Sequence, residues 1–463
     1  MKRAKGVSVQ RAVSVVVAAL CAGGAAAAPA HDEVERGTAI DGVPAWVATL
    51  STTRWTELPT PVFDAWVRAN LVPATGYYGS NPVGSVRDAY SNPLFDPAGK
   101  TFYLAGGGHN DGSLNAVFKF DAATLTWGIA VPPTPPSAYP PAFNTTQAAI
   151  VYPSGATTGW FQSAATLTDP RDVPYAAPFP ARRAMHAYSG TTFHNGKISF
   201  YYQSVVGDAD VVNHTWTNLR QQTYGAQLNA ISPSLGTADQ YLQDGLAAAT
   251  DPVTGKGWVT LNSGSAGINA RGHLMRIDPA TQTIERLVGA PNVSWGSPSL
   301  AFVGRELYGV TSRQSPGNPN VSLANSGFHF DTRIDAPATT VFTITGDVPV
   351  RPTSSMRQET VPIFSDDFSV WMWNYVSEPD ALYRVDLAPV GGSGTGADPH
   401  VLVSTRIALE ASGIPPVALT YKLDYIREWG VVMILPSASS KWWAIKVDRL
   451  LGDAVFANGF DVP

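Results

Sequence analysis

The amino-acid sequence predicts an all-β fold, a single β-propeller of six or seven four-stranded blades. Three observations lead to this prediction. Apolar and polar residues alternate in short runs separated by Asp-Gly, Asn-Gly and Pro signals, a pattern typical of strands and turns. A unit of about fifty to sixty residues recurs along the chain, which is the spacing of propeller blades. No stretch with helical periodicity is long enough to compete with this pattern.

Each copy of the unit follows one template. An apolar strand, a turn rich in Asp and Gly, and a second apolar strand lead into a longer connection. A third strand then ends in an aromatic residue, Ile or Val followed by Asp. Six copies are visible, and they cover residues 88–127, 185–216, 245–283, 299–331, 360–386 and 423–448. Residues 148–161, in the gap after the first copy, are either a degenerate extra blade or an insertion.

The segment before the first copy is expected to close the ring. Residues 46–50 and 54–58 both have the composition of strands, and a lone N-terminal strand often completes the last blade of a propeller. The sequence therefore predicts a polar leader over residues 31–44, the propeller over 45–452 and a C-terminal tail over 453–463.

The first thirty residues have the pattern of a secretory signal peptide. A basic start precedes an apolar, alanine-rich stretch from Ala12 to Ala28, and Ala28-Pro29-Ala30 offers a cleavage site. Cleavage removes four basic and no acidic residues, so the formal net charge changes from −5 to −9. The single cysteine, Cys21, is lost as well, which excludes disulfides and thiolate metal sites in the mature chain. We expect a secreted or periplasmic protein.

Composition also limits the partners. An acidic chain is a poor nucleic-acid binder, because the phosphate backbone attracts basic surfaces. No run after the signal peptide is long and apolar enough to span a membrane. We expect a monomer that binds a polysaccharide or another glycan.

The first copy resembles a kelch repeat. Two glycines follow its second strand, its third strand ends in Phe120-Asp121, and Trp127 comes six residues after that aspartate. Residues 89–91, 106–109 and Asn115 are also similar to a large group of secreted bacterial kelch-like propellers. The resemblance implies kelch-like four-stranded blades and leaves the activity open.

The geometry of such a propeller sorts the ionisable residues by face. The connections between the second and third strands, and the segments leading into each first strand, lie at the mouth of the central channel. Arg87 and Asp88 fall there, whereas His194 falls in a turn on the opposite face. The predicted catalytic residues are His109, His186, Tyr188 and Arg183, and the predicted substrate-binding residues are Asn110, Asp111, Tyr90, Arg271, His273 and Arg357.

Histidine, tyrosine and arginine together suit β-elimination on a uronate-containing polysaccharide. A cation neutralises the substrate carboxylate, one Tyr or His removes the adjacent proton, and another protonates the leaving oxygen. The fold and residue set are similar to those of propeller polysaccharide lyases of the ulvan lyase type. No second histidine lies between His109 and His186, which departs from a simple transfer of that family's motif.

Each of these residues also has a structural interpretation. His109 follows three glycines and could brace its bend through hydrogen bonds, and Arg183 could pair with an acid of a neighbouring blade. The alternative function is therefore a non-catalytic kelch-like module that binds glycan or protein at the same mouth. The histidine spacing predicts no metal site, although the sequence leaves open whether a structural or catalytic divalent ion is bound.

The sequence disfavours several other enzyme classes, some of which share the propeller fold. For tryptophan and aspartate it predicts mainly structural roles. A copper-radical oxidase needs a cysteine that the mature chain lacks, and the sequence has no sialidase boxes, serine elbow or phosphate loop. Most tryptophans should form the core, with Trp295 or Trp373 available to stack on sugar rings at the mouth. Aspartates at strand ends should accept turn N–H bonds; these are Asp121, Asp278, Asp331, Asp386 and Asp448.

Overall fold

The structure is a computed structural model of residues 1–463. It describes residues 42–71, 83–88, 93–105, 114, 116–133, 191–202, 205–217, 248–262, 271–278, 281, 283–294, 299–311, 326–333, 340–349, 363–366, 369–375, 378–387, 401–417 and 423–447. The chain divides into two compact units, residues 1–42 and 43–463, and the strands and helices of the described part belong to the second.

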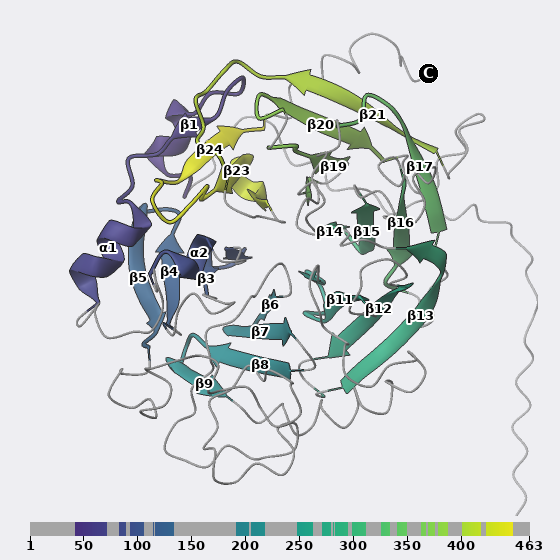
Figure 1. The fold of residues 1–463 in the computed structure, drawn as a ribbon, viewed down its shortest axis with the longest axis horizontal. Helices are drawn as coiled ribbons and strands as arrows, with labels where there is room; N and C mark the ends of the chain where they lie inside the picture. Colours follow the sequence, from purple (N-terminus) through teal and green to yellow (C-terminus); the bar gives the residue numbers. More distant parts are fainter. Residues whose placement is uncertain are drawn as a thin grey trace, which may run out of the picture. The chain divides into compact units, whose positions relative to one another are not determined.

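The strands of the second unit form antiparallel four-stranded arrays in chain order (Figure 1). The first array contains β2 (Leu94–Asp96), β3 (Thr101–Leu104), β4 (Val117–Asp121) and β5 (Thr126–Val131). The second contains β6 (Thr191–His194), β7 (Lys197–Tyr202), β8 (Val205–Asp210) and β9 (Thr215–Thr217). The third contains β10 (Ala248–Thr250), β11 (Gly257–Asn262), β12 (Arg271–Asp278) and β13 (Thr283–Ser294).

The next two arrays share one eight-stranded sheet, because β17 and β21 pair in parallel. The fourth array contains β14 (Ser299–Val303), β15 (Glu306–Thr311), β16 (Ser326–Asp331) and β17 (Thr340–Gly346). The fifth contains β18 (Ile363–Ser365), β19 (Ser369–Met372), β20 (Ala381–Asp386) and β21 (Val401–Ala408).

The last array joins the two ends of the unit. It contains β22 (Asp424–Ile426), β23 (Val431–Ile434) and β24 (Trp443–Lys446), and its fourth strand is β1 (Thr56–Glu57). Thr56 pairs with Ala444 and Glu57 with Trp443, so the predicted closure by residues 54–58 is confirmed.

Consecutive arrays are neighbours in space. The first strand of each array lies against the first strand of the next, from β2 through β6, β10, β14 and β18 to β22. The first and last arrays also pack together, because Phe102 and Phe120 each place their ring centroid 4.7 Å from that of Trp442. This cyclic order of antiparallel sheets is that of a β-propeller.

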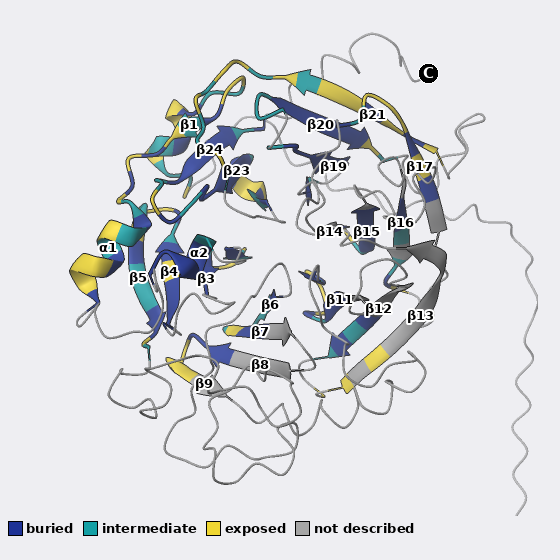
Figure 2. Cartoon of the chain, viewed as in Figure 1, coloured by how far each residue is buried: buried dark blue, intermediate teal, exposed yellow. Residues whose placement is uncertain are grey.

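The core lies between the arrays. Leu94 and Val117 of the first array bury against Ile198 and Ala209 of the second. Similar apolar clusters join the fourth array to the fifth, the fifth to the last, and the last to the first. A strand covered on both faces is buried along its whole length, as in β19 and β23, whereas the outer β21 alternates between buried and exposed residues (Figure 2).

One prediction for the N-terminal segment is wrong. Residues 46–50, expected as a strand, mostly form the 3₁₀ helix η1 (Ala45–Thr49). The Trp46 indole donates to the Ala122 carbonyl at 3.1 Å and packs edge-on against Trp429. The contacts of this side chain, and not strand pairing, hold the segment in place.

Helices are also present where none was expected. The helix α1 (Phe63–Asn70) is short, but Phe63 and Val67 lie one turn apart and are fully buried against the first and last arrays. The helix α2 (Ser85–Asp88) occupies residues just ahead of the first array, and a second 3₁₀ helix, η7 (Arg427–Trp429), connects β22 to β23. Tertiary burial stabilises such short helices, which have too few residues to show a clear period in the sequence. Within the described residues, no helix is long and apolar enough to cross a membrane.

Candidate functional site

The two ends of the arrays differ in the length of their connections. At the end that we call the turn end, first and second strands are joined through short segments such as 97–100, 195–196 and 304–305. At the other end, the loop end, the described strands flank longer segments, which are 105–116 and 312–325 within arrays and 132–190 and 218–247 between arrays. Segments 387–400, 203–204 and 295–298 depart from this pattern. Long connections on a rigid scaffold are where binding and catalytic residues concentrate.

Aspartates organise the turn end. Asp121 accepts the Thr124 N–H at 2.8 Å, Asp278 that of Thr281 and Asp331 that of Arg333, as predicted from the sequence. Asp96, Asp210 and Asp251 cap further turns of the same end in the same way. For Asp386 the described contacts are with Ser369 and Arg384, and Asp448 lies outside the described residues.

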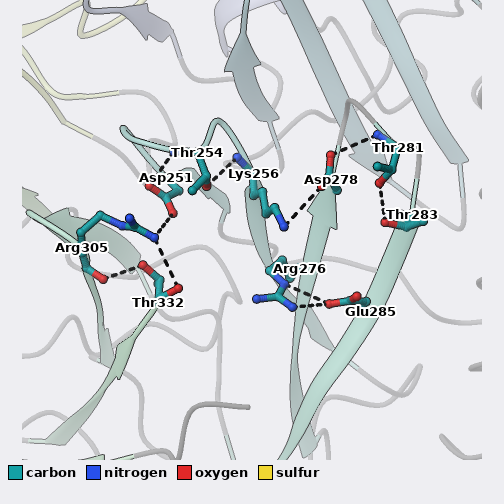
Figure 3. Close-up of polar contacts among 10 residues, drawn as sticks. All are labelled: Asp251, Thr254, Lys256, Arg276, Asp278, Thr281, Thr283, Glu285, Arg305 and Thr332. Carbon is teal, nitrogen blue, oxygen red and sulfur yellow. Dashed lines mark hydrogen bonds and ion pairs between the residues drawn. The ribbon is translucent and has the colours of Figure 1, made fainter. Parts of the chain in front are cut away.

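Some of these turns also contact each other between arrays. Asp251, 2% exposed, accepts from Val253 and Thr254 and lies 3.7 Å from the Arg305 guanidinium of the next array. Figure 3 shows Arg305 reaching the Thr332 carbonyl as well as Asp251. His194 belongs to this end, as expected, and its ring packs against Gly255 of the neighbouring turn. The polar residues of the turn end thus stabilise turns and contacts between arrays, and the candidate site belongs to the loop end.

Most of the predicted site lies outside the described residues. This holds for all four predicted catalytic residues and for four of the predicted substrate-binding ones. They are His109, His186, Tyr188, Arg183, Asn110, Asp111, Tyr90 and Arg357. Their roles stay predictions.

The other two predicted binding residues, Arg271 and His273, are described as main chain at the start of β12. His273 pairs with Leu261 of β11, and the register toward β13 shifts between Arg271 and His273. The strand begins after segment 263–270, so both residues stand at the loop end. Their roles in binding also stay predictions.

Arg87 and Asp88 are at the loop end, and their environment differs from an open mouth. The Arg87 side chain is 0% exposed; its Nε donates to the Leu435 carbonyl at 2.8 Å and its Nη2 to that of Pro436 at 3.0 Å. Burial lowers the pKa of Arg87 to about 10, so it stays protonated at neutral pH. Asp88 accepts the Ala438 N–H at 2.8 Å, and burial raises the pKa of its carboxyl.

The residues that these two groups hold were missed by the sequence interpretation. They belong to the connection between β23 and β24, residues 435–442, which also contains hydrogen-bonded Ser437 and Ser440. A buried arginine bound to carbonyls about 350 residues away leaves no local pattern, and only the adjacency of Arg87 and Asp88 to Tyr90 could have drawn attention to it.

Trp373 is a core residue, so its predicted role in sugar stacking is wrong. Its side chain is 0% exposed, its indole donates to the Pro379 carbonyl, and its ring lies 4.8 Å from that of Trp55. Trp295 lies outside the described residues. Within the part of the chain that the structure describes, no group of three His, Cys, Asp or Glu residues is arranged to hold a metal ion.

Comparisons with known proteins give no family for this chain. No family model matches the sequence, and no curated protein matches it. Solved structures similar to it include a calcium-binding protein, regucalcin, from Agrobacterium tumefaciens, with 13% identity over 81% of this chain and 88% of that chain at a TM-score of 0.36. A luciferin-regenerating enzyme shares 9% identity over 80% and 94%, with a TM-score of 0.37.

A third similar structure is the GH74 xyloglucanase from Xanthomonas campestris. The two sequences are 13% identical over an alignment that covers 81% of this chain and 47% of the xyloglucanase chain, with a TM-score of 0.39. At these TM-scores the similarities carry no argument, and the assignment to the β-propeller fold depends on the cyclic order of the sheets described above.

Proposed function

We propose that the protein is a secreted carbohydrate-active β-propeller of six blades that cleaves an acidic, uronate-containing polysaccharide at its loop end. The observation that carries the proposal is the difference between the two ends of the arrays. Asp-capped turns occupy one end, whereas the strands that flank the two longest connections, 132–190 and 218–247, end at the other. In the sequence, the four candidate catalytic residues fall within segments 105–116 and 132–190. The six blades in this proposal are the six arrays of the described residues.

The residue types at that end match β-elimination. Arg183 would neutralise the uronate carboxylate, which acidifies the adjacent C–H bond. His109 or Tyr188 would remove that proton, the bond to the oxygen on the next carbon would break, and a carbon–carbon double bond would form. His186 would then protonate the leaving oxygen, so that protons and electrons balance without any further reactant. Tyr90, Arg271, His273 and Arg357 would bind flanking sugars.

A non-catalytic glycan-binding module is the second candidate. In that alternative the loop end binds glycan or protein without catalysing a reaction. Arg87 would take no direct part in either candidate, because its side chain is fully buried and bound to main-chain carbonyls.

The test incubates the purified protein with polygalacturonate, alginate and ulvan and follows the ultraviolet absorbance of an unsaturated uronate. We expect absorbance to rise with at least one polymer, and His109→Ala to lower the rate by at least a hundredfold, the scale of general acid–base catalysis. His194→Ala is the matched control, since His194 belongs to the turn end, and it should keep the full rate.

The outcomes separate the two candidates. Binding to an affinity gel without any rise in absorbance would leave the binding module and exclude the lyase. A full rate in the His109→Ala variant would remove His109 from the mechanism, even if the protein is a lyase.

A further inference from the structure

The connection between β23 and β24 is held from two sides by the N-terminal part of the propeller. On one side, the N–H of Leu58 donates to the Trp442 carbonyl at 2.8 Å and the Trp442 N–H donates to the Thr60 hydroxyl at 3.1 Å, which continues the pairing of β1 with β24. On the other side, Arg87 and Asp88 of α2 bind the main chain of Leu435, Pro436 and Ala438. The last array is therefore joined to the start of the propeller by a strand and by hydrogen bonds from two charged side chains, of which Arg87 is fully buried.

The side chains of Arg87 and Asp88 together bind three main-chain groups of an irregular segment. The arginine fork spans two successive carbonyls, and the neighbouring carboxylate takes the N–H two residues further on. The other main-chain group of Ala438 is also bound, because its carbonyl accepts the N–H of Asp64 at 2.9 Å. Ala438 is thus fixed at both its N–H and its carbonyl.

Stability alone is a poor reason for this arrangement. Burying a guanidinium and a carboxylate costs desolvation energy, and well-packed apolar residues often stabilise such a position as well or better. A buried charge does impose one geometry on the main-chain groups that it binds, because an arrangement that breaks those hydrogen bonds leaves the charge poorly solvated.

The connection that these two side chains bind belongs to the loop end, to which the proposed function assigns the site. In the sequence, Asp88 precedes Tyr90, a proposed substrate-binding residue, by two positions. We propose that Arg87 and Asp88 are positioning residues, which fix the β23–β24 connection as part of the polysaccharide site. This inference rests on the proposed function and adds to it the residues that arrange the site.

The experiment compares Asp88→Ala with Asp88→Asn. Asn can still accept the Ala438 N–H, whereas Ala cannot, so Asn is the conservative rescue. Asp64→Ala is the matched control: the Asp64 carboxylate pairs with Arg68 on the surface of α1, and its bond to Ala438 is through the main chain and persists. Each variant is measured by hydrogen exchange over residues 435–441 and by affinity for the polymer, among polygalacturonate, alginate and ulvan, that the unmodified protein binds.

We expect Asp88→Ala to speed exchange at Ala438 about tenfold and to weaken polymer binding about tenfold at a temperature well below its melting point. Asp88→Asn should recover most of both, and Asp64→Ala should change neither. Faster exchange with unchanged affinity would overturn the positioning role, and so would unchanged exchange. If the unmodified protein binds none of the three polymers, the proposed function fails first, and this inference falls with it.

If Asp88→Ala does not fold, Asp88→Asn with Arg87→Lys decides the matter. Lys keeps the charge but cannot reproduce the fork that spans two carbonyls. Arg87→Lys should then show faster exchange and weaker binding than Asp88→Asn, and equal values for the two variants would contradict the proposal.

Discussion

Aspartates at strand ends differ in how far they are buried, and we expect their contributions to the free energy of unfolding to differ accordingly. Asp121 caps one partly exposed turn through the Thr124 N–H. Asp251 caps its turn through two N–H groups and also faces Arg305 of the next array, with almost no exposure to solvent. Asp121 therefore stabilises a single turn, whereas Asp251 stabilises its turn and the interface between two arrays.

Replacement of the two aspartates by alanine should separate these roles. We expect Asp251→Ala to lower the free energy of unfolding by about 3 kcal/mol, because it leaves buried N–H groups and a partly buried guanidinium without the carboxylate. Asp121→Ala should cost about 1 kcal/mol, the value of an ordinary hydrogen bond. Urea unfolding followed by tryptophan fluorescence measures both, and equal losses would contradict the interface role of Asp251.

At the scale of elements, the arrays meet through aromatic and apolar side chains that the alternation of each strand supplies. Tyr103 of β3 stacks on Phe193 of β6, with ring centroids 5.4 Å apart. Burial, with a smaller contribution from Asp96, raises the pKa of Tyr103 to about 12. The interface between the first two arrays thus contains a titratable group whose neutral form the fold prefers.

This preference has a consequence at alkaline pH. In the unfolded chain a tyrosine loses its proton near pH 10, whereas Tyr103 in the folded chain keeps it to about pH 12. The contribution of the neutral Tyr103 to the free energy of unfolding is fully present below pH 10 and is lost as the pH rises through 12. Tyr103→Phe should therefore flatten the fall in stability between pH 10 and pH 12, with little change at pH 7.

Tyr383→Phe provides the comparison for that experiment. The pKa of Tyr383 is also raised to about 12, by burial and then by Glu378, to which its hydroxyl donates at 2.6 Å. This variant should flatten the alkaline fall too, but it should also lose about 1.5 to 3 kcal/mol at pH 7, because a hydrogen bond to a charged group is removed. Thermal melts over the pH range measure both effects, and an unchanged alkaline slope in both variants would refute the assignment.

For the whole molecule, the decisive feature is the pairing of β1 with β24. It places residues 56–57 beside residues 443–444 and completes the last array. Trp55, just before β1, is buried in the cluster that joins the fifth and last arrays. Without this segment, β24 would present an unpaired edge, and the last array would lose part of its core.

Two N-terminal deletions test the closure. Removal of residues 1–42, a separate unit, should leave the melting temperature of the propeller nearly unchanged. Removal of residues 1–58 eliminates β1 and Trp55 and should abolish the cooperative transition or lower stability by at least about 4 kcal/mol, the cost of losing one buried tryptophan. Calorimetry distinguishes the two, and a cooperative melt of the shorter chain at the original temperature would show that the propeller closes by other contacts.

Local patterns in the sequence were sufficient for the arrays themselves. Alternating apolar residues, Asp-rich turns and a recurring unit predicted six or seven blades, and the six visible copies correspond to the six arrays of the described residues, because the strands and turns of one array depend on residues near one another in the chain. The short helices α1 and α2 were not predictable in this way, since their stability comes from partners contributed by distant arrays.

What only the tertiary structure decided is which ionisable groups are buried. Arg87 looked like a residue of the channel mouth, and the fold instead places it against the carbonyls of Leu435 and Pro436. Trp373 looked available for sugar rings and is packed on Trp55. The type of a side chain is written in the sequence, but its exposure depends on segments hundreds of residues away, and so the sequence by itself determined the architecture while the folded chain determined which side chains are left for chemistry.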